Sequence, residues 1–261
     1  FPIAGPDEVV APLLAAASPR TRLALLDHVT SPTALVFPLA RLVPALRERG
    51  VETLVDGAHA PGMVPLALDA LGAAYYTGNA HKWLCAPKGA AFLHVRADLR
   101  ASTHPLAISH GFAPDASPDR FRAEFDWTGT ADPTPFLVVP DAIAFLGSLV
   151  PGGWPEVMSR NRALALEARG LLLEALGAPA PVPESMVGSI ASVPLPAPAP
   201  GSPAERLPHE ALMDWFRARD VETWLYPWPC AGGKLLRLAA QLYNAREEYV
   251  RLAGLLREAL G

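Results

Sequence analysis

The sequence predicts an α/β protein with a largely parallel sheet and flanking helices in residues 1–150, followed by a smaller α+β domain over 151–261. Blocks typical of strands and helices alternate in the first part, as they do in parallel sheets. Polar residues follow several of these strands, at the edge where such sheets bind ligands. The alternation stops near 149–155, which we take as the domain boundary.

In the first part, apolar runs of strand length alternate with amphipathic segments. The run Leu-Ala-Leu-Leu at 23–26 is apolar throughout, which predicts a strand buried on both faces. Segment 38–49 places its apolar residues on one face and ends at Gly50, which indicates a helix. We also expect strands at 53–55, 74–77 and 89–95, the last of which could run antiparallel, and a short helix over 63–71.

The second part mixes longer helices with isolated strands. A buried helix is expected over 133–149 and a long amphipathic helix over 154–176. Loops rich in proline and alanine then separate shorter elements. We expect these to be strands at 190–193, 222–225 and 235–238, and helices at 207–219 and 245–260.

The composition argues against several classes of protein. The 261 residues carry a net charge of -4, which disfavours a protein that neutralises nucleic-acid phosphates. Hydrophobic residues make up 51% of the chain, enough to build a buried core. The two cysteines, Cys85 and Cys230, cannot form a disulfide framework or a four-thiolate zinc site, so we expect a reducing, cytoplasmic location.

We expect neither a signal peptide nor a membrane span in this sequence. Its first residues include acidic side chains and no basic segment. Prolines and charged residues interrupt the longest apolar stretches. The sequence does not begin with Met, so it could be a piece of a longer chain.

Six segments carry a resemblance to a known family. The central two are LVDGAHAPG at 54–62 and YYTGNAHKWLCAPKG at 75–89. The others are DHVTSPT at 27–33, SHG at 109–111, WTGTAD at 127–132 and LRLAAQLYN at 236–244. In this order they resemble the class V aminotransferase family, and within it the isopenicillin N epimerase-like branch. The resemblance implies the fold type I architecture, pyridoxal 5′-phosphate (PLP) as the cofactor and a small amino acid as the substrate.

The resemblance assigns the main chemical roles to three residues. Lys82 would form the internal aldimine with PLP, a role that needs an amine with a depressed pKa. Asp56 would face the pyridine nitrogen and keep the ring cationic. His59 would lie near the ring, where it would tune the aldimine or pass a proton. Taken alone, the same residues also fit a surface lysine, a turn aspartate and a packed histidine.

Four further residues match cofactor-binding positions of the family. Thr77, Asn79 and His81 would bind the phosphate, although relatives often have serine at the position of Asn79. Ser31 would lie near the hydroxyl oxygen of the ring, where many desulfurases have asparagine.

Two more segments imply an assembly and a substrate contact. Gly129 and Thr130 resemble the loop that reaches the phosphate of the neighbouring subunit, which implies a homodimer with shared active sites. Arg237 matches the arginine that grips the substrate's α-carboxylate. A simple turn at 127–132 and a surface ion pair of Arg237 are the alternatives.

These roles imply removal of the α-proton from an amino acid, followed by one of several outcomes. The resemblance favours epimerisation, with a C–S lyase or cysteine desulfurase activity as the second candidate and transamination as the third. We expect Cys230 not to be a catalytic thiol, because its flanks differ from the desulfurase loop. We expect Cys85 to be a packed thiol.

Two alternatives lie outside this chemistry. The N-terminal portion of the family, which supplies a phosphate loop and a ring-stacking residue, has no counterpart in these residues, so the chain could be a non-catalytic truncated relative. His59, His81, Asp56 and Cys85 could in principle bind a metal, but their spacing matches no metal motif and we expect no metal site.

Overall fold

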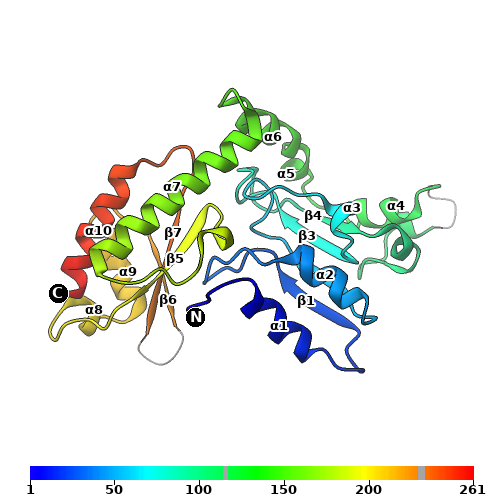
Figure 1. The fold of residues 1–261 in the computed structure, drawn as a ribbon. Helices are drawn as coiled ribbons and strands as arrows, with labels where there is room; N and C mark the ends of the chain where they lie inside the picture. Colours follow the sequence, from blue (N-terminus) through cyan, green and yellow to red (C-terminus); the bar gives the residue numbers. More distant parts are fainter. Residues whose placement is uncertain (114–116, 229–232) are drawn as a thin grey trace.

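The computed structural model describes residues 1–113, 117–228 and 233–261, which form two sheets and their helices (Figure 1). A four-stranded sheet lies in the first part of the chain and a three-stranded sheet in the second. The long helix α7 (Gly153–Leu176) follows the first part and packs on the second sheet. The α/β class predicted from the sequence is confirmed.

The strands of the first sheet lie in chain order: β1 (Leu23–Asp27), β2 (Glu52–Asp56), β3 (Tyr75–Asn79) and β4 (Ala91–Val95). The first three are parallel, and β4 runs antiparallel to β3. Parallel strands bring their carboxyl ends to one edge of a sheet. The polar residues that follow β1, β2 and β3 therefore come together at this edge.

Three helices cover one face of the first sheet: α1 (Asp7–Ala16), α2 (Leu39–Arg47) and α3 (Leu68–Leu71). Their apolar side chains form a core with Val55 and Tyr76, neither of which is exposed. Burial of these side chains supplies the main stabilisation of this half of the chain, because the hydrophobic effect scales with the apolar area removed from water.

The opposite face of the first sheet is open to solvent in the described part of the chain. Leu23 and Leu25 of β1 point to this face together with Leu93 of β4, because side chains alternate along a strand. Leu25 is 67% exposed and Leu23 48%. The expectation that the first strand is buried on both faces is therefore wrong. An apolar strand needs a second covering layer to be buried twice, and the described elements do not supply it.

The second sheet has the strand order β5 (Ile190–Leu195), β7 (Lys234–Ala239), β6 (Trp224–Pro227), and all its pairs are antiparallel. Helix α7 packs against this sheet and against α10 (Arg246–Leu260), and Figure 1 shows the two helices side by side. Apolar side chains of the sheet and of these helices form a second core, in which Leu236 is fully buried. The remaining helices of this part are α8 (Pro203–Arg206) and α9 (His209–Arg217).

Residues 31–37, which follow β1, connect the first sheet to the second. The Ser192 hydroxyl of β5 donates to the Thr33 carbonyl at 2.7 Å, and the Val36 amide donates to the Met186 carbonyl at 2.9 Å. Leu35 belongs to the core of the second sheet. The end of β1 is thus held by both halves of the chain.

Two predicted helices differ from the structure. The helix expected over 63–71 begins only at Leu68, because Pro65 disfavours helical backbone at the residue before it. The buried helix expected over 133–149 is two helices, α5 (Thr134–Leu137) and α6 (Val139–Ser148), and α6 is mostly exposed. Shorter elements are α4 (Arg120–Asp126) and 3-10 turns at Ala97–Ser102, His110–Phe112 and Glu184–Met186.

Within the residues described, no single helix has the length and apolar character needed to cross a membrane. Helices 134–148 and 153–176 satisfy both criteria only as a pair, with a bend of 71° between them.

Candidate functional site

Two carboxylates and a hydroxyl lie in register at the carboxyl edge of the first sheet. Asp56 of β2 pairs with Asp27 of β1 on one side and with Thr77 of β3 on the other. Because paired residues share a face, these side chains point to the open face, as does Asn79 two residues beyond Thr77. Burial and the charge of Asp56 raise the pKa of Asp27. The strand order thus gathers polar groups on one side of the sheet, as expected from the sequence.

Lys82 and His59 meet beside this edge. The loop after β2 carries His59, and the turn after β3 carries Lys82, with 3.3 Å between Lys82 Nζ and His59 Nε2. The other ring nitrogen, His59 Nδ1, accepts a hydrogen bond from the Trp83 indole at 3.4 Å. Gly62 has a φ of 80°, and a Cβ there would lie 3.0 Å from the Trp83 carbonyl, so glycine permits this close approach of the two loops.

The surroundings of Lys82 and His59 favour their neutral forms. Burial lowers the pKa of His59 to about 4, and the positive charges of Lys82 and Arg237 add to this effect against the opposing charge of Asp56. Burial also lowers the pKa of Lys82. The negative charge of Asp56 raises this pKa, and the positive charge of Arg237 lowers it further. A lysine with a lowered pKa is a stronger nucleophile near neutral pH than an ordinary lysine.

The backbone after Asp56 is fixed by a packed tyrosine. A Cβ at Gly57 would lie 2.3 Å from ring atoms of Tyr76, so only glycine fits there. The Tyr76 hydroxyl in turn lies 2.8 Å from His28 Nδ1. This contact positions His28 beside Asp56 at the end of β1.

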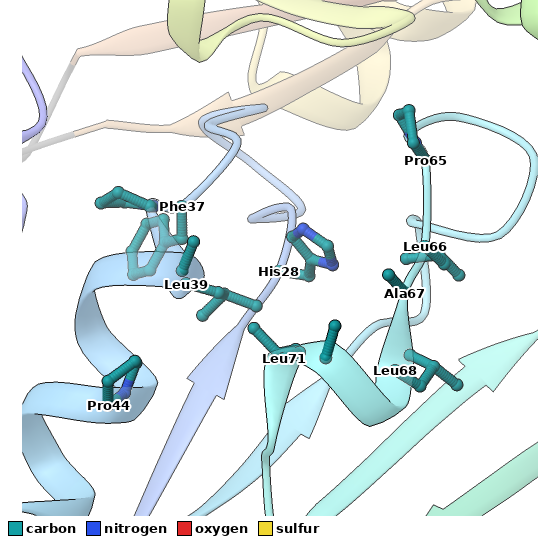
Figure 2. A pocket seen from close by; sticks show the side chains of 12 residues that line it. His28, Phe37, Leu39, Pro44, Pro65, Leu66, Ala67, Leu68 and Leu71 are labelled. Carbon is teal, nitrogen blue, oxygen red and sulfur yellow. The ribbon is translucent and has the colours of Figure 1, made fainter.

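His28 also borders a cavity on the helix-covered side of the sheet. Figure 2 shows its ring between the start of α2 and segment 65–71, at a cavity of about 400 Å³. The lining is mostly apolar, and it includes neither Lys82, His59 nor Arg237. This cavity is therefore separate from the cluster around Lys82.

Arg237 reaches the first sheet from β7. Its Nη1 atom donates to the Ser31 carbonyl at 2.8 Å and to the Ser31 hydroxyl at 3.0 Å. The guanidinium also lies over the ring of Tyr226, 5.3 Å from its centroid. The structure thus joins a residue near the N-terminus of the chain with one near its C-terminus.

The remaining candidate residues form no hydrogen bond with Lys82 or Asp56 in the described part of the chain. His81 Nδ1 is buried and has no hydrogen-bond partner in the described part of the chain. Gly129 and Thr130 lie in an exposed loop, and no hydrogen bond joins them to Lys82 or Asp56 among the described residues. Residues 1–113, 117–228 and 233–261 hold no group of three or more His, Cys, Asp or Glu side chains that could bind a metal ion.

The structure describes Cys85 but not Cys230. Cys85 was expected to be packed and is exposed, because it lies in the surface turn closed by its own amide and the Lys82 carbonyl at 3.3 Å. Cys230 lies outside the described residues.

Sequence reasoning missed three residues of this region: Trp83, Tyr76 and Tyr226. The signal for Trp83 was its position directly after Lys82, since a buried indole usually has a hydrogen-bond partner. The signal for Tyr76 was the alternation of side chains along β3, which places it on the buried face, opposite Thr77. Nothing in the local sequence pairs Tyr226 with Arg237.

The family model described as aminotransferase class V matches residues 7–175. The chain is 40% identical to isopenicillin N epimerase of Amycolatopsis lactamdurans over 98% of its own length, and 36% identical to that of Streptomyces clavuligerus over 96%. It is 36% identical to the putative L-cysteine desulfhydrase 1 of Oryza sativa subsp. japonica over 75%. The chain spans 65%, 63% and 41% of the lengths of these three relatives.

Solved structures share the fold at low sequence identity. The cystine C-S lyase C-DES, in complex with cysteine persulfide, superposes with a TM-score of 0.75 at 20% identity, over 97% of this chain and 65% of that one. A mutant of that enzyme, with glycine covalently linked to its PLP cofactor, gives a TM-score of 0.74 at 20% identity, over 96% and 64%.

Proposed function

The chain belongs to the class V aminotransferase family, and from this premise we propose that it acts on the α-carbon of an amino acid with PLP held by Lys82. The family match confirms the resemblance inferred from the sequence motifs. The enzymes of this family are PLP-dependent. The reaction, the substrate and the roles of individual residues are proposals for this chain.

The residues of the site fit PLP in charge and in donor type. Lys82 offers a half-buried amine with a lowered pKa, and Asp56 offers a carboxylate on the same side of the sheet. The buried Nδ1 of His81, which has no partner within the described residues, would be satisfied by a phosphate oxygen. Thr77 and Asn79 add a hydroxyl and an amide at the same edge.

The chain's own residues would divide the work as follows. Lys82 would hold the cofactor covalently through Nζ, Asp56 would keep the ring nitrogen protonated, and Arg237 would bind the substrate carboxylate. When bound, PLP withdraws electrons from the α-carbon and so acidifies the α-proton. Once the substrate amine had replaced it on the cofactor, Lys82 Nζ would be free to accept this proton, a task that needs an amine without its own extra proton.

We propose epimerisation as the net reaction. The α-proton would leave one face of the α-carbon, and a proton exchanged with solvent would be added to the opposite face, which inverts the centre. The observation that carries this proposal is the contact of Lys82 with His59 beside Asp56, in a chain 40% identical to an isopenicillin N epimerase. Ser31, His59 and His81 would complete the contacts to the cofactor.

A C–S lyase or cysteine desulfurase reaction is the second candidate. It would begin with the same proton removal and continue with loss of a sulfur leaving group from the β-carbon. The 36% identity to a putative L-cysteine desulfhydrase favours it. Transamination and a non-catalytic role are further outcomes of the experiment below.

We further propose a cytoplasmic homodimer with shared active sites. Gly129 and Thr130 lie in an exposed loop, where they could reach the phosphate of a neighbouring subunit. The two cysteines support a reducing compartment, and the net charge of -4 supports the absence of nucleic-acid partners. We expect no membrane association.

Cofactor attachment is the first test. The purified chain is mixed with PLP, treated with borohydride and digested, and mass spectrometry locates the pyridoxyl label. We expect the label on Lys82 and its loss in Lys82→Ala, whereas Lys88→Ala keeps it. A label on Lys88 or Lys234, or none at all, would overturn the proposed site.

The reaction is then tested with a panel of L-amino acids in deuterated water. Deuterium at the α-carbon of a D-product supports epimerisation, whereas pyruvate with sulfide supports the lyase alternative. If sulfide is released and Cys230→Ser stops it, a catalytic role for that thiol replaces our expectation. A labelled Lys82 without α-proton exchange on any amino acid would leave the non-catalytic role.

A further inference from the structure

Trp83 forms one end of a short chain of contacts that leads to the Lys82 amine. Its indole nitrogen lies 3.4 Å from His59 Nδ1, and His59 Nε2 lies 3.3 Å from Lys82 Nζ. The indole is held in a core cluster with Val29, Met63 and other apolar residues, and only 8% of Trp83 is exposed. The donor position of the indole is therefore fixed by packing.

The indole contact determines which nitrogen of His59 carries the proton. An indole N–H can only donate, so the His59 Nδ1 that faces it must be the unprotonated, accepting nitrogen. Burial keeps the ring neutral near neutral pH, because it lowers the pKa of His59 to about 4. A neutral imidazole with an unprotonated Nδ1 carries its hydrogen on Nε2.

The hydrogen on His59 Nε2 then faces Lys82. A protonated lysine has three donors and no acceptor, so its ammonium would oppose this N–H. A neutral amine has a lone pair that can accept it. The charges around the pair come from Asp56 on β2, which favours the ammonium, and from Arg237 on β7, which disfavours it.

We propose that Trp83 is a positioning residue that fixes His59 as the Nε2–H tautomer and thereby holds the Lys82 amine in its neutral, nucleophilic form. The free amine is the form that attacks the aldehyde of a cofactor and accepts a proton from carbon. This inference deepens the proposed function and depends on it for its catalytic meaning. The tautomer itself is a property of the protein without cofactor.

The test uses Trp83→Phe, which removes the indole N–H and keeps an aromatic ring. Trp154→Phe is the matched control, because its indole donates at 3.0 Å to a backbone carbonyl, that of Ile143, and not to a histidine. The cofactor-free proteins are labelled with ¹⁵N in the histidine rings, and the His59 signals are identified by their loss in His59→Gln. We expect a protonated Nε2 and an unprotonated Nδ1 in the wild type, and a switch or mixture of tautomers in Trp83→Phe alone.

The second measurement is the titration of Lys82. The sequence has only three lysines, Lys82, Lys88 and Lys234, so ¹³C labels at Cε can be followed individually by NMR. We expect Trp83→Phe to raise the midpoint of the Lys82 titration by about one pH unit. This is the size expected when the hydrogen bond from His59 Nε2, which favours the neutral amine, is lost. The rate of PLP attachment near neutral pH should fall about tenfold, the factor that one pH unit represents, and recover at higher pH.

The outcomes separate this inference from the proposed function. A wild-type His59 protonated on Nδ1, or a Lys82 midpoint equal in wild type and Trp83→Phe, would overturn the role of Trp83 even if PLP binds. The expected tautomer without any PLP attachment would contradict the proposed function and leave the inference standing. If Trp83→Phe does not fold, the tautomer of His59 in the wild type still tests whether His59 is the Nε2–H form.

Discussion

Arg237 Nη1 donates to both the carbonyl oxygen and the hydroxyl of Ser31. The described residues give Nη2 and Nε no hydrogen-bond partner. Ser31 thus anchors one corner of the guanidinium and leaves two parallel donors for a carboxylate. Lysine has a single nitrogen and cannot perform both tasks.

We therefore expect Arg237→Lys to raise KM for an amino-acid substrate about 10- to 100-fold with a smaller change in kcat, since it removes a bidentate charge-assisted contact. Ser31→Ala should have a weaker effect, because the carbonyl contact remains. Arg246→Lys, which alters an exposed pair with Glu167 at 2.7 Å, is the control and should change neither constant. Steady-state kinetics provide the measurement, and an unchanged KM in Arg237→Lys would contradict the assignment.

For Asp56→Asn, we expect α-proton exchange with deuterated water to slow about 10²- to 10³-fold, a cost typical of losing one fixed electrostatic contact. The amide would no longer hold a positive charge on the ring nitrogen. Asp69→Asn is the control, because Asp69 lies 3.1 Å from His94 on another part of the surface. Mass spectrometry follows the exchange, and a wild-type rate in Asp56→Asn would remove this residue from the mechanism.

Gly57→Ala should destabilise the protein by about 1–3 kcal/mol, the usual cost of overpacking. The new methyl would lie 2.3 Å from the ring of Tyr76, which is fully buried and contacts His28 through its hydroxyl. Gly170→Ala is the comparison, because nothing lies within 4 Å of its Cβ position and alanine favours the helix. Urea unfolding should give a lower midpoint for the first variant and an equal or higher one for the second.

Stability should fall as the pH drops from about 6.5 towards 4. Burial lowers the pKa of His28 from 6.5 to about 4, so the unfolded chain binds a proton in this window and the folded chain does not. The free energy of unfolding therefore rises with pH across the window, by up to about 3 kcal/mol for this residue.

The check is the unfolding midpoint of wild type and His28→Gln at about pH 7 and about pH 5. The variant should lose less stability at the lower pH than the wild type. Equal losses would show that His28 does not titrate as its burial requires. The carboxyl of Glu52, whose pKa Arg96 lowers, contributes equally to wild type and His28→Gln, so the comparison of the two proteins removes its effect.

The sequence was sufficient for the strand ends and insufficient for contacts between distant segments. Asp56 and Thr77 could be placed at one edge because each ends a strand of a parallel sheet, and the antiparallel direction of the last strand could be anticipated. The neighbours of Arg237 could not be predicted, because Ser31 lies 206 positions away from it in the sequence. The orientation of the two sheets, which brings them together, leaves no local pattern.

Burial was the least predictable property. Leu25 has the sequence environment of a core residue and is 67% exposed, because burial depends on a covering layer and not on the strand itself. Cys85 likewise is a small apolar residue that its turn places at the surface. Hydrophobicity thus identified the elements better than it identified their surroundings.

The turn between β1 and α2 has a consequence for the lifetime of the site. Hydrogen bonds from Ser192 and Arg237 fasten this turn to the second sheet, while the Thr30 hydroxyl closes it internally by accepting from the Leu35 amide at 2.8 Å. Neither sheet can open without breaking these bonds. The amide hydrogens of Leu35 and Val36 should therefore exchange with solvent only through cooperative opening of both halves, so the slowest-exchanging amides of the molecule include some beside the candidate site.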